Sequence, residues 1–281
     1  MKAPETLRRT VQAASMLAVR GGRAHRQADR LAAEEPMEIR AAGPGQEPAD
    51  VAVTMRTPGH DFELAVGFLF TEGLIGSPDD VLSVAYCDLP EGDQQYNVVT
   101  VQLSMPFDAE ATRRNFFATS SCGVCGKASM DQLEVRCAHV PLGFTVPAAV
   151  VVTLPERLRE AQRIFEQTGG LHASGLFDAG GALRSLREDV GRHNALDKLI
   201  GEAFLAGSLP LSDQVVLVSG RASFELVQKA AVGGVPVLCA VSAPSSLAVD
   251  TAEQLGVTLV GFLRDGSFNL YTHPERVILD A

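Results

Sequence analysis

Two cysteines separated by two residues are the feature of this sequence with the clearest chemical potential. Cys122 and Cys125 lie in the run SSCGVCGK at residues 120–127, where small residues surround both thiols. Three interpretations fit this spacing: incidental small residues, half of a zinc site, and thiol or sulfur chemistry. The density of small residues around the pair makes the first interpretation the weakest of the three.

A zinc site would need two ligands beyond this pair. Cys137 and His139 follow in the chain, but at a spacing shorter than that of paired zinc half-sites, and Cys137-x-His139 is not a standard half-site. We therefore predict no metal at this motif, and structural zinc remains the minority interpretation.

Sulfur chemistry requires a thiolate on an accessible loop. A nearby helix N-terminus and the cation of Lys127 would both favour the ionised form of a cysteine here. Such a thiolate can attack a persulfide on a partner protein and then pass the outer sulfur onward. Cys87 and Cys239 lie instead in apolar runs, and we interpret them as small core residues.

Composition limits the class of protein that carries this motif. The chain has 281 residues, 46% of them hydrophobic and 21% charged, which indicates a folded protein of about two domains. It contains no apolar stretch long enough to span a membrane. A net charge of −10 argues against general nucleic-acid binding. Five cysteines without a secretory signal argue against a disulfide framework and favour the cytoplasm.

Charge is unevenly distributed along the chain. Residues 1–30 hold seven basic and two acidic side chains, a balance of +5, so the remainder carries −15. We predict that residues 1–30 form a basic, mobile leader, with a transit peptide as the alternative.

The first half reads as a small α+β lobe over residues 31–118. Short strands are expected at 37–40, 50–56, 81–86 and 97–103. A helix is expected to begin at Asp61 as its N-cap, because apolar residues follow at helical spacing. Residues 119–147 are then a long functional loop and linker that carries the two cysteines.

The second half, residues 148–281, alternates helices with apolar strands. A capping box at Thr153 and Glu156 predicts the first helix, which Gly169 and Gly170 end. The order α-β-β-α-β-α-β-α-β with a last short strand at 269–272 predicts a mostly parallel sheet between helices. In such sheets, ligands bind beyond the carboxyl ends of the strands.

Six blocks along the chain match the motifs of one family. SSCGVCGK resembles the signature loop of the formate dehydrogenase accessory sulfurtransferase family (FdhD). Similar blocks are TPGHDFELAVGFL at 57–69, TGGLHA at 168–173, EDVGRHNALDK at 188–198, SGRASFE at 219–225 and SAPSSLA at 242–248. The resemblance covers roughly residues 35–275 and leaves the first thirty residues outside.

This resemblance implies a cytoplasmic sulfurtransferase. Sulfur would arrive from a cysteine desulfurase as a persulfide on Cys122, with Cys125 assisting or relaying it. The acceptor would be the molybdenum cofactor, Mo-bis(molybdopterin guanine dinucleotide), destined for formate dehydrogenase. The resemblance also implies a homodimer, no nucleic-acid or membrane partner, and a cytidine deaminase-like three-layer α/β fold for the second lobe.

The deaminase relationship can be checked against the residues. The expected helix starts read GRHN at 191–194 and SGRAS at 219–223, without paired thiols, and His193-Asn194-Ala195 lacks the catalytic glutamate. The sequence therefore lacks a deaminase-type zinc site, which argues against deamination; a nucleotide-handling enzyme such as a deaminase remains a rival function, which would require bound zinc. What remains are phosphate-binding groups at helix N-termini. The candidate contacts are Arg192, Arg221 and Ser223 for phosphate and Asp189 or Asp197 for guanine or ribose, with a helix cap or surface ion pair as the alternative for each. His193 and His172 are candidate proton donors or cofactor contacts, with a packed core histidine as the alternative, and a site role is favoured for His193.

A tight turn after the last buried strand completes the candidate site. By family resemblance, six consecutive residues contribute to cofactor binding: Phe262, Leu263, Arg264, Asp265, Gly266 and Ser267. A simple hairpin is the plain interpretation of this turn. A non-catalytic chaperone that binds the molybdenum cofactor or a guanine nucleotide remains the alternative function.

Overall fold

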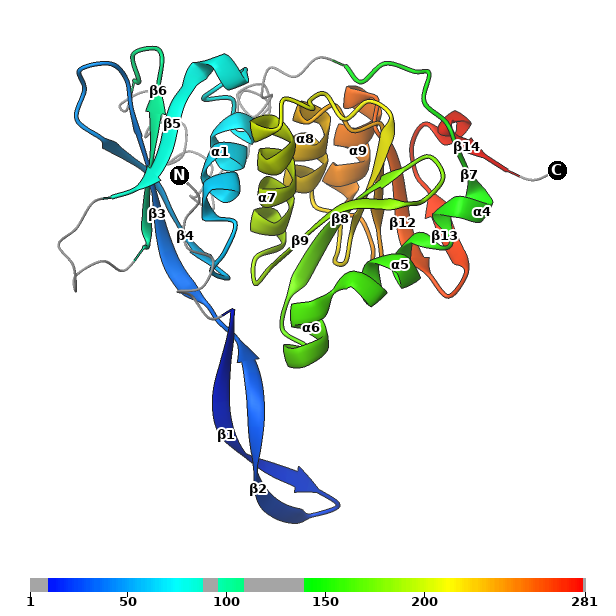
Figure 1. Ribbon diagram of the computed structural model, residues 1–281. Coiled ribbons are helices and arrows are strands. Elements are labelled where there is room, and N and C mark those ends of the chain that lie inside the picture. Colours follow the sequence, from blue (N-terminus) through cyan, green and yellow to red (C-terminus); the bar gives the residue numbers. More distant parts are fainter. Residues whose placement is uncertain (1–9, 88–95, 109–138, 280–281) are drawn as a thin grey trace.

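The computed structural model describes residues 10–87, 96–108 and 139–279 (Figure 1). Within these ranges two lobes and a projecting hairpin are seen. None of the helices in the described ranges has the length and apolar character needed to cross a lipid bilayer.

The first lobe is a four-stranded sheet covered by one helix. Its strands are β3 (Glu35–Ala42), β4 (Ala49–Arg56), β5 (Val81–Tyr86) and β6 (Val98–Leu103), arranged in the order β4-β3-β6-β5. The 3₁₀ turn η1 (Pro78–Asp80) precedes β5. Helix α1 (Asp61–Thr71) packs on the sheet and buries Leu64 and Leu69 in one apolar cluster with Met37 and Ile39 of β3. The four strands and the helix that the sequence predicts for this region are present.

The N-cap of helix α1 lies one residue earlier in the sequence than predicted. The N-cap is His60, in the left-handed conformation at φ 58° and ψ 30°, and Asp61 is the first helical residue. The Asp61 carboxylate does not cap the helix. It forms a buried bidentate ion pair with Arg56, at 3.0 and 2.9 Å, and accepts a hydrogen bond from the hydroxyl of Tyr86. The Asp61 side chain therefore forms an ion pair with Arg56 in place of the predicted capping hydrogen bond.

The second lobe is a six-stranded sheet in the order β13-β12-β11-β10-β8-β9. The strands are β8 (His172–Asp178), β9 (Leu183–Asp189), β10 (Gln214–Val218), β11 (Val237–Ala240), β12 (Thr258–Arg264) and β13 (Ser267–Leu270). Only β10–β11 and β11–β12 pair in parallel; β8–β9, β8–β10 and β12–β13 are antiparallel. The prediction of a mostly parallel sheet was wrong, because short turns join β8 to β9 and β12 to β13 and so force antiparallel pairing.

Helices cover both faces of this sheet and give three layers. Helices α7 (Arg192–Leu205), α8 (Phe224–Val232) and α9 (Ser246–Leu255) pack on one face. Helices α4 (Ala148–Val151) and α5 (Leu154–Ala161) pack on the other face. Near them, β7 (Val146–Pro147) pairs with β14 (Val277–Ile278), and the 3₁₀ turn η2 (Pro274–Arg276) comes directly before β14. The α/β fold class is confirmed, and the relationship to cytidine deaminase remains a prediction.

The first helix predicted for this lobe is divided in two. Helix α6 (Arg163–Thr168) follows α5 after a break at Gln162, where ψ is 76°. Thr153 makes no capping bond, because its hydroxyl donates to the carbonyl of Val150 at 2.7 Å. The hydroxyl therefore bonds to the preceding turn of α4, and the predicted capping box does not form.

The two lobes meet where α1 crosses α7, side by side in Figure 1. Glycines stand at the crossing: a Cβ on Gly67 would lie 1.9 Å from the carbonyl oxygen of Asp197, and one on Gly201 would lie 1.9 Å from that of Glu63. No side chain fits in either place, so the helices approach backbone to backbone. The predicted boundary between residues 118 and 119 lies outside the described residues.

Part of the predicted leader forms a hairpin. Strands β1 (Val11–Arg20) and β2 (Arg23–Ala32) pair along their full length, joined by Gly21 and Gly22 at φ 56° and 77°. Two glycines with positive φ suit the turn of a two-residue hairpin. The strands in residues 11–30 were not foreseen from the sequence, and the mobility of this basic leader stays a prediction; residues 1–9 lie outside the described ranges.

Candidate functional site

The polar residues predicted to bind a ligand gather at one edge of the second lobe. Strands β10, β11 and β12 end there, and α7 and α8 begin there, in the lower part of Figure 1 on the side from which the hairpin projects. Backbone bonds link the loops after β10 and β11 to the end of β12: Ser242 N donates to Gly220 O at 3.2 Å, and Phe262 N donates to Ser242 O at 3.1 Å. We call this continuous edge the ledge, defined by residues 219–223, 242–245 and 262–267.

His193 is the centre of a polar cluster on the ledge. Its Nε2 lies 2.8 Å from a carboxylate oxygen of Glu225 and 3.3 Å from the hydroxyl of Ser223. The hydrogen bond from His193 lowers the pKa of Glu225. Sequence analysis missed Glu225, although its place two residues after Ser223, in the first turn of α8, could have indicated it.

Arg192 and Arg221 place cations beside this cluster. Arg192 is the first residue of α7, and its Nε is buried without a hydrogen-bond partner in the described part of the chain. A buried donor of this kind calls for an acceptor, and two helix N-termini nearby favour an anion. Arg221 is exposed in the loop before α8. The structure therefore brings Arg192, His193, Arg221 and Ser223 to one edge, as the sequence predicted.

His172 begins β8 next to the end of β10. Ser219 fixes this junction, since its hydroxyl accepts the N–H of Ala173 at 2.9 Å and its own N–H donates to Ala173 O at 2.9 Å. A Cβ on Gly220 would lie 3.3 Å from His172 Nδ1, so the ring lies closely against this glycine. His172 thus faces the ledge from the strand neighbouring β10.

The His172 ring should titrate below the usual histidine range. Burial lowers its pKa most, the charges of Arg192 and His193 lower it further, and Asp189 opposes them. Because the unfolded chain then binds the proton more readily, His172 lowers stability as the pH falls below about 6.5 and has no such effect above it. NMR titration of the ring measures this. Arg192→Gln should raise the His172 pKa and Arg184→Gln should not; a midpoint at or above that of a free histidine would contradict the assignment.

The turn between β12 and β13 supplies the exposed rim of the ledge. Asp265 and Gly266 have φ of 52° and 70°, and Arg264, Asp265, Gly266 and Ser267 are all exposed. The Arg264 guanidinium lies over the Phe262 ring at 5.7 Å. Leu263 differs: it is fully buried in the core, so its side chain does not reach the surface. Phe262 itself is half-buried at positive φ, 53°.

Asp189 and Asp197 are engaged between the lobes and not at the ledge. Asp189 pairs with Lys198 at 2.6 Å and accepts the N–H of Thr57 at 3.1 Å, while Asp197 pairs with Lys229 at 3.0 Å. Both carboxylates are almost completely buried. The suggestion that they contact guanine or ribose does not fit this placement.

The two cysteines of the CxxC motif lie outside the described residues, as do Lys127 and Cys137. Of the described cysteines, Cys87 is half-buried after β5 and Cys239 is buried in β11, where burial raises the pKa of its thiol. That thiol stays protonated at neutral pH and cannot serve as a nucleophile. Within the described ranges no three His, Cys, Asp or Glu side chains cluster as a metal site would require.

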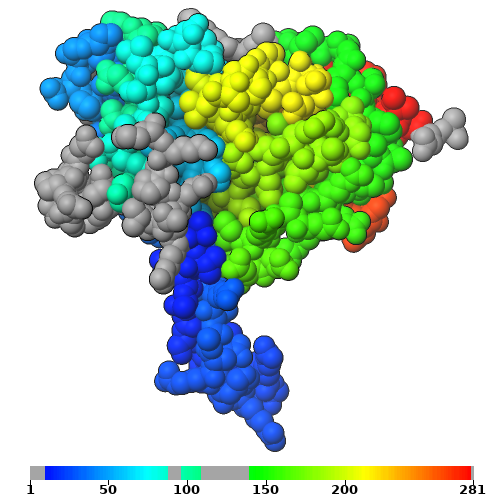
Figure 2. Space-filling model, in the orientation of Figure 1, coloured from blue at the N-terminus to red at the C-terminus, as the bar shows by residue number. Residues whose placement is uncertain are grey.

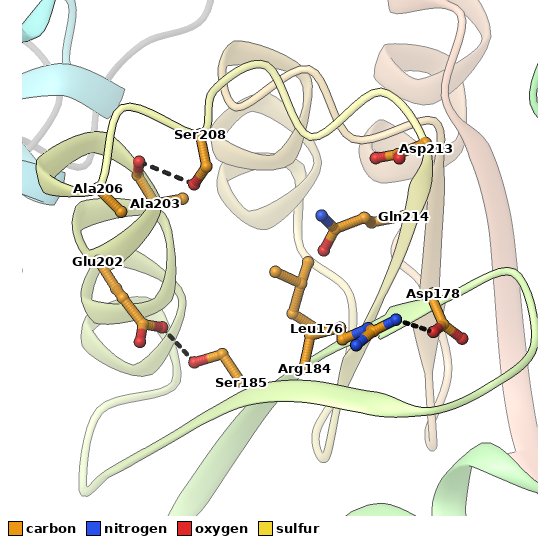
Figure 3. A pocket seen from close by; sticks show the side chains of 10 residues that line it. All are labelled: Leu176, Asp178, Arg184, Ser185, Glu202, Ala203, Ala206, Ser208, Asp213 and Gln214. Atoms are coloured by element: carbon orange, nitrogen blue, oxygen red, sulfur yellow. Dashed lines mark hydrogen bonds and ion pairs between the residues drawn. The ribbon is translucent and has the colours of Figure 1, made fainter.

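A separate pocket lies at the opposite end of the sheet (Figure 3). It has a volume of about 440 Å³ and lies between the end of α7 and the start of β10, with Glu202 and Gln214 on opposite sides. The ion pair of Arg184 with Asp178, at 2.7 Å, closes its lower rim. None of the residues predicted to bind a ligand lines it, so it is distinct from the ledge.

Comparison with known proteins finds relatives that match this chain over most of its length and over most of their own length. The model of the FdhD/NarQ family matches residues 32–278. The sulfur carrier protein FdhD of Streptomyces avermitilis is 49% identical over 281 residues, covering 97% of this chain and 98% of the relative. The protein of the same name from Mycolicibacterium paratuberculosis is 52% identical over 263 residues, covering 91% of this chain and 94% of the relative.

A solved structure shows the same fold. It is the crystal structure of a protein proposed to be a formate dehydrogenase accessory protein, from Desulfotalea psychrophila. The TM-score is 0.72 at 23% identity, and the match covers 96% of this chain and all of that one. At this identity the likeness supports the arrangement of helices and strands.

Proposed function

The chain belongs to the FdhD/NarQ family, and from that premise we propose that it is a cytoplasmic sulfur carrier for formate dehydrogenase. The observation that carries this proposal is the CGVC motif at 122–125 in a chain that matches named sulfur carriers from end to end. The charge and spacing of the motif support thiol chemistry independently of the family.

Sulfur loading follows from thiolate chemistry. The Cys122 thiolate attacks the outer sulfur of a persulfide on a cysteine desulfurase, a new S–S bond forms on Cys122, and the desulfurase cysteine leaves as a thiolate. No electron is gained or lost overall, so no oxidant is needed. Cys125 assists or relays the sulfur. In the transfer to the acceptor cofactor the S–S bond on Cys122 would break, Cys122 would leave as a thiolate, and the two electrons that reduce the outer sulfur to a sulfide ligand would come from the molybdenum of the acceptor.

The ledge is the proposed binding surface for that acceptor, Mo-bis(molybdopterin guanine dinucleotide), which is the substrate of the transfer. Its pyrophosphates carry the charge that the N-termini of α7 and α8 favour. The buried Nε of Arg192 lacks an acceptor within the described chain, and a phosphate oxygen would supply one. His193, Ser223 and the exposed 264–267 turn offer further polar contacts.

Transfer of radioactive sulfur tests this proposal. The chain is incubated with a desulfurase and labelled cysteine, re-purified, and mixed with formate dehydrogenase that carries cofactor without the sulfur ligand. We expect label to move to the dehydrogenase together with activity. Cofactor binding without label on the chain would instead indicate the chaperone function.

Arg192→Gln should weaken the binding of a guanine nucleotide such as GDP. A charge-assisted hydrogen bond contributes about 1.5–3 kcal/mol, which corresponds to a roughly 10–100-fold increase in Kd. Calorimetry measures the affinity, and thermal unfolding checks that the fold is retained. Arg184→Gln, at the opposite end of the sheet, is the matched control and should bind GDP as the unaltered chain does. Equal GDP affinities for the two variants would show that Arg192 does not contact the bound nucleotide.

A further inference from the structure

The pocket at the opposite end of the sheet from the ledge has no part in the function proposed above. Its volume of about 440 Å³ is of the size that takes a small molecule. Figure 2 shows the segment that follows α7, in yellow, on the surface of the body at the end away from the projecting hairpin. We call this pocket the distal pocket; the side chains that matter to the argument are those of Leu176, Asp178, Arg184, Glu202, Asp213 and Gln214.

The charge of the distal pocket favours a cation. Among the described residues that line it, Asp178, Glu202 and Asp213 carry carboxylates, and Arg184 is the one basic side chain. Arg184 is already paired with Asp178 at 2.7 Å. The end of α7 also lines the pocket, and its last turn holds no basic side chain, so the partial negative charge of the helix C-terminus adds to that of the carboxylates.

The polar atoms that the distal pocket offers to a ligand are mainly acceptors. The Ser208 hydroxyl donates its proton to the carbonyl of Ala203 at 3.0 Å, and the Ser185 hydroxyl donates to Glu202. The Oε1 atom of Gln214 is buried and has no hydrogen-bond partner in the described part of the chain. A buried acceptor calls for a donor, and an ammonium group offers three donors and no acceptor.

Glu202 is fixed in place and keeps its charge. One of its carboxylate oxygens pairs with Arg187 at 2.9 Å, and the other accepts from Ser185. Arg187 also donates to Glu63 at 2.9 Å, so one guanidinium faces two carboxylates and the group stays negative. The Glu202 side chain is 38% exposed, and each carboxylate oxygen can accept a second bond. Glu202 is therefore an accessible acceptor that is already held in position.

The placement of the carboxylates favours an elongated cation over a metal ion. Glu202 lies on one side of the distal pocket, Asp213 and Gln214 lie on the other, and Leu176 lies between them (Figure 3). A divalent metal needs several oxygens directed at one point, and no three His, Cys, Asp or Glu side chains of the described residues gather in that way. An ion with two charged ends and an apolar middle matches this arrangement.

We propose that the distal pocket binds a linear aliphatic diamine. One ammonium group pairs with Glu202, the other pairs with Asp213 and donates to Gln214 Oε1, and the methylene chain lies over Leu176. This site does not depend on the sulfur-carrier function, because it shares no residue with the ledge or with the CGVC motif.

Calorimetry of the full chain with putrescine tests the proposal. Putrescine should bind at least about 10-fold more tightly than butylamine, because the monoamine lacks one of the two charge-assisted contacts. Butanediol, which is uncharged, should not bind. Higher salt should weaken the binding of putrescine, since the contacts are electrostatic. Magnesium ions at the concentration of putrescine should not displace it.

Three variants locate the bound diamine. Asp213→Asn should raise the Kd for putrescine about 10-fold, whereas Arg184→Gln should lower it, because that change leaves the Asp178 carboxylate unpaired. Asp250→Asn is the matched control: it removes an exposed carboxylate from α9, outside the pocket, and should leave the Kd unchanged. Thermal unfolding checks the fold of each variant, and GDP binding should be the same in all three.

Opposite effects of Asp213→Asn and Arg184→Gln would not follow from a structural role of either residue. Four results would overturn the proposal: no binding of putrescine at millimolar concentration, equal affinities for putrescine and butylamine, displacement by magnesium ions, or the same Kd for Asp213→Asn as for Asp250→Asn. A loss of sulfur transfer would leave these measurements unaffected, so the two proposals can fail separately.

Discussion

Replacing Cys122 by alanine is expected to abolish the production of active formate dehydrogenase. Without this thiolate the proposed persulfide cannot form at position 122, and neither Cys239 nor Cys87 is suited to replace it. Cys239 is buried with a raised pKa, and Cys87 lies outside the glycine-rich loop. The expected loss is complete within the sensitivity of the assay, measured as formate oxidation in cells that depend on this chain.

Two further variants sharpen this prediction. Cys87→Ser should retain full activity, which shows that loss of any cysteine is not sufficient. Cys125→Ser should show an intermediate activity if Cys125 relays sulfur, and almost none if it is the acceptor. Binding of GDP by Cys122→Ala should be unchanged, because Cys122 is not among the residues that define the ledge. Full activity in Cys122→Ala would refute its role as the carrier.

Lys198→Met is expected to lower the stability of the whole chain more than any surface substitution. Lys198 and Asp189 are 1% and 0% exposed, and Lys198 also donates to the carbonyl of Thr57 in the other lobe at 2.8 Å. Removing one member of a buried pair leaves an uncompensated charge, at a cost of about 3–5 kcal/mol. Denaturant unfolding measures this loss, and Tm should fall by about 10 °C.

Double substitution separates the buried charge from the lost packing. Lys198→Met with Asp189→Asn removes both charges and should recover part of the stability lost by the single variant. Arg184→Met breaks an exposed ion pair and serves as the control, with an expected cost below about 1 kcal/mol. Equal losses for Lys198→Met and Arg184→Met would show that the lobes are not held together by this pair.

The elements of the second lobe could be predicted because their signals are local. The apolar run of β10 and the glycines after α6 and α9 depend on a few neighbouring residues, and the structure has these elements where the sequence placed them. The predicted helix caps at Asp61 and Thr153 were wrong because capping depends on contacts with residues outside the local pattern. Each side chain had a competing partner, Arg56 or the carbonyl of Val150, that a local pattern does not show.

The contact between the lobes could not be predicted at all. Lys198 and Lys229 are the two lysines of the described residues, and both are buried between the lobes, although lysine is usually exposed. Their partners Thr57 and Glu72 lie more than a hundred residues away in the sequence. Nothing in the surrounding residues indicates such pairing.

The ledge was partly predictable. Arg192, His193, Arg221 and Ser223 were identified as groups at helix starts, and parallel strands bring successive helix starts to one edge. The burial of Leu263 and Asp189 was not foreseen, because burial depends on the packing of the whole lobe, and the role of Leu263 in cofactor binding stays a prediction. Glu225 was missed because an acidic residue in a first helical turn is common and carries little information by itself.

Mass spectrometry of the intact chain after incubation with a cysteine desulfurase and cysteine tests the central claim most directly. We expect the chain to become heavier by one sulfur atom, with the addition mapped to the peptide that contains Cys122 and reversed by a thiol reductant. A chain that gains no sulfur under conditions where the desulfurase itself is loaded, or one whose two loop thiols hold a metal ion, would contradict the account.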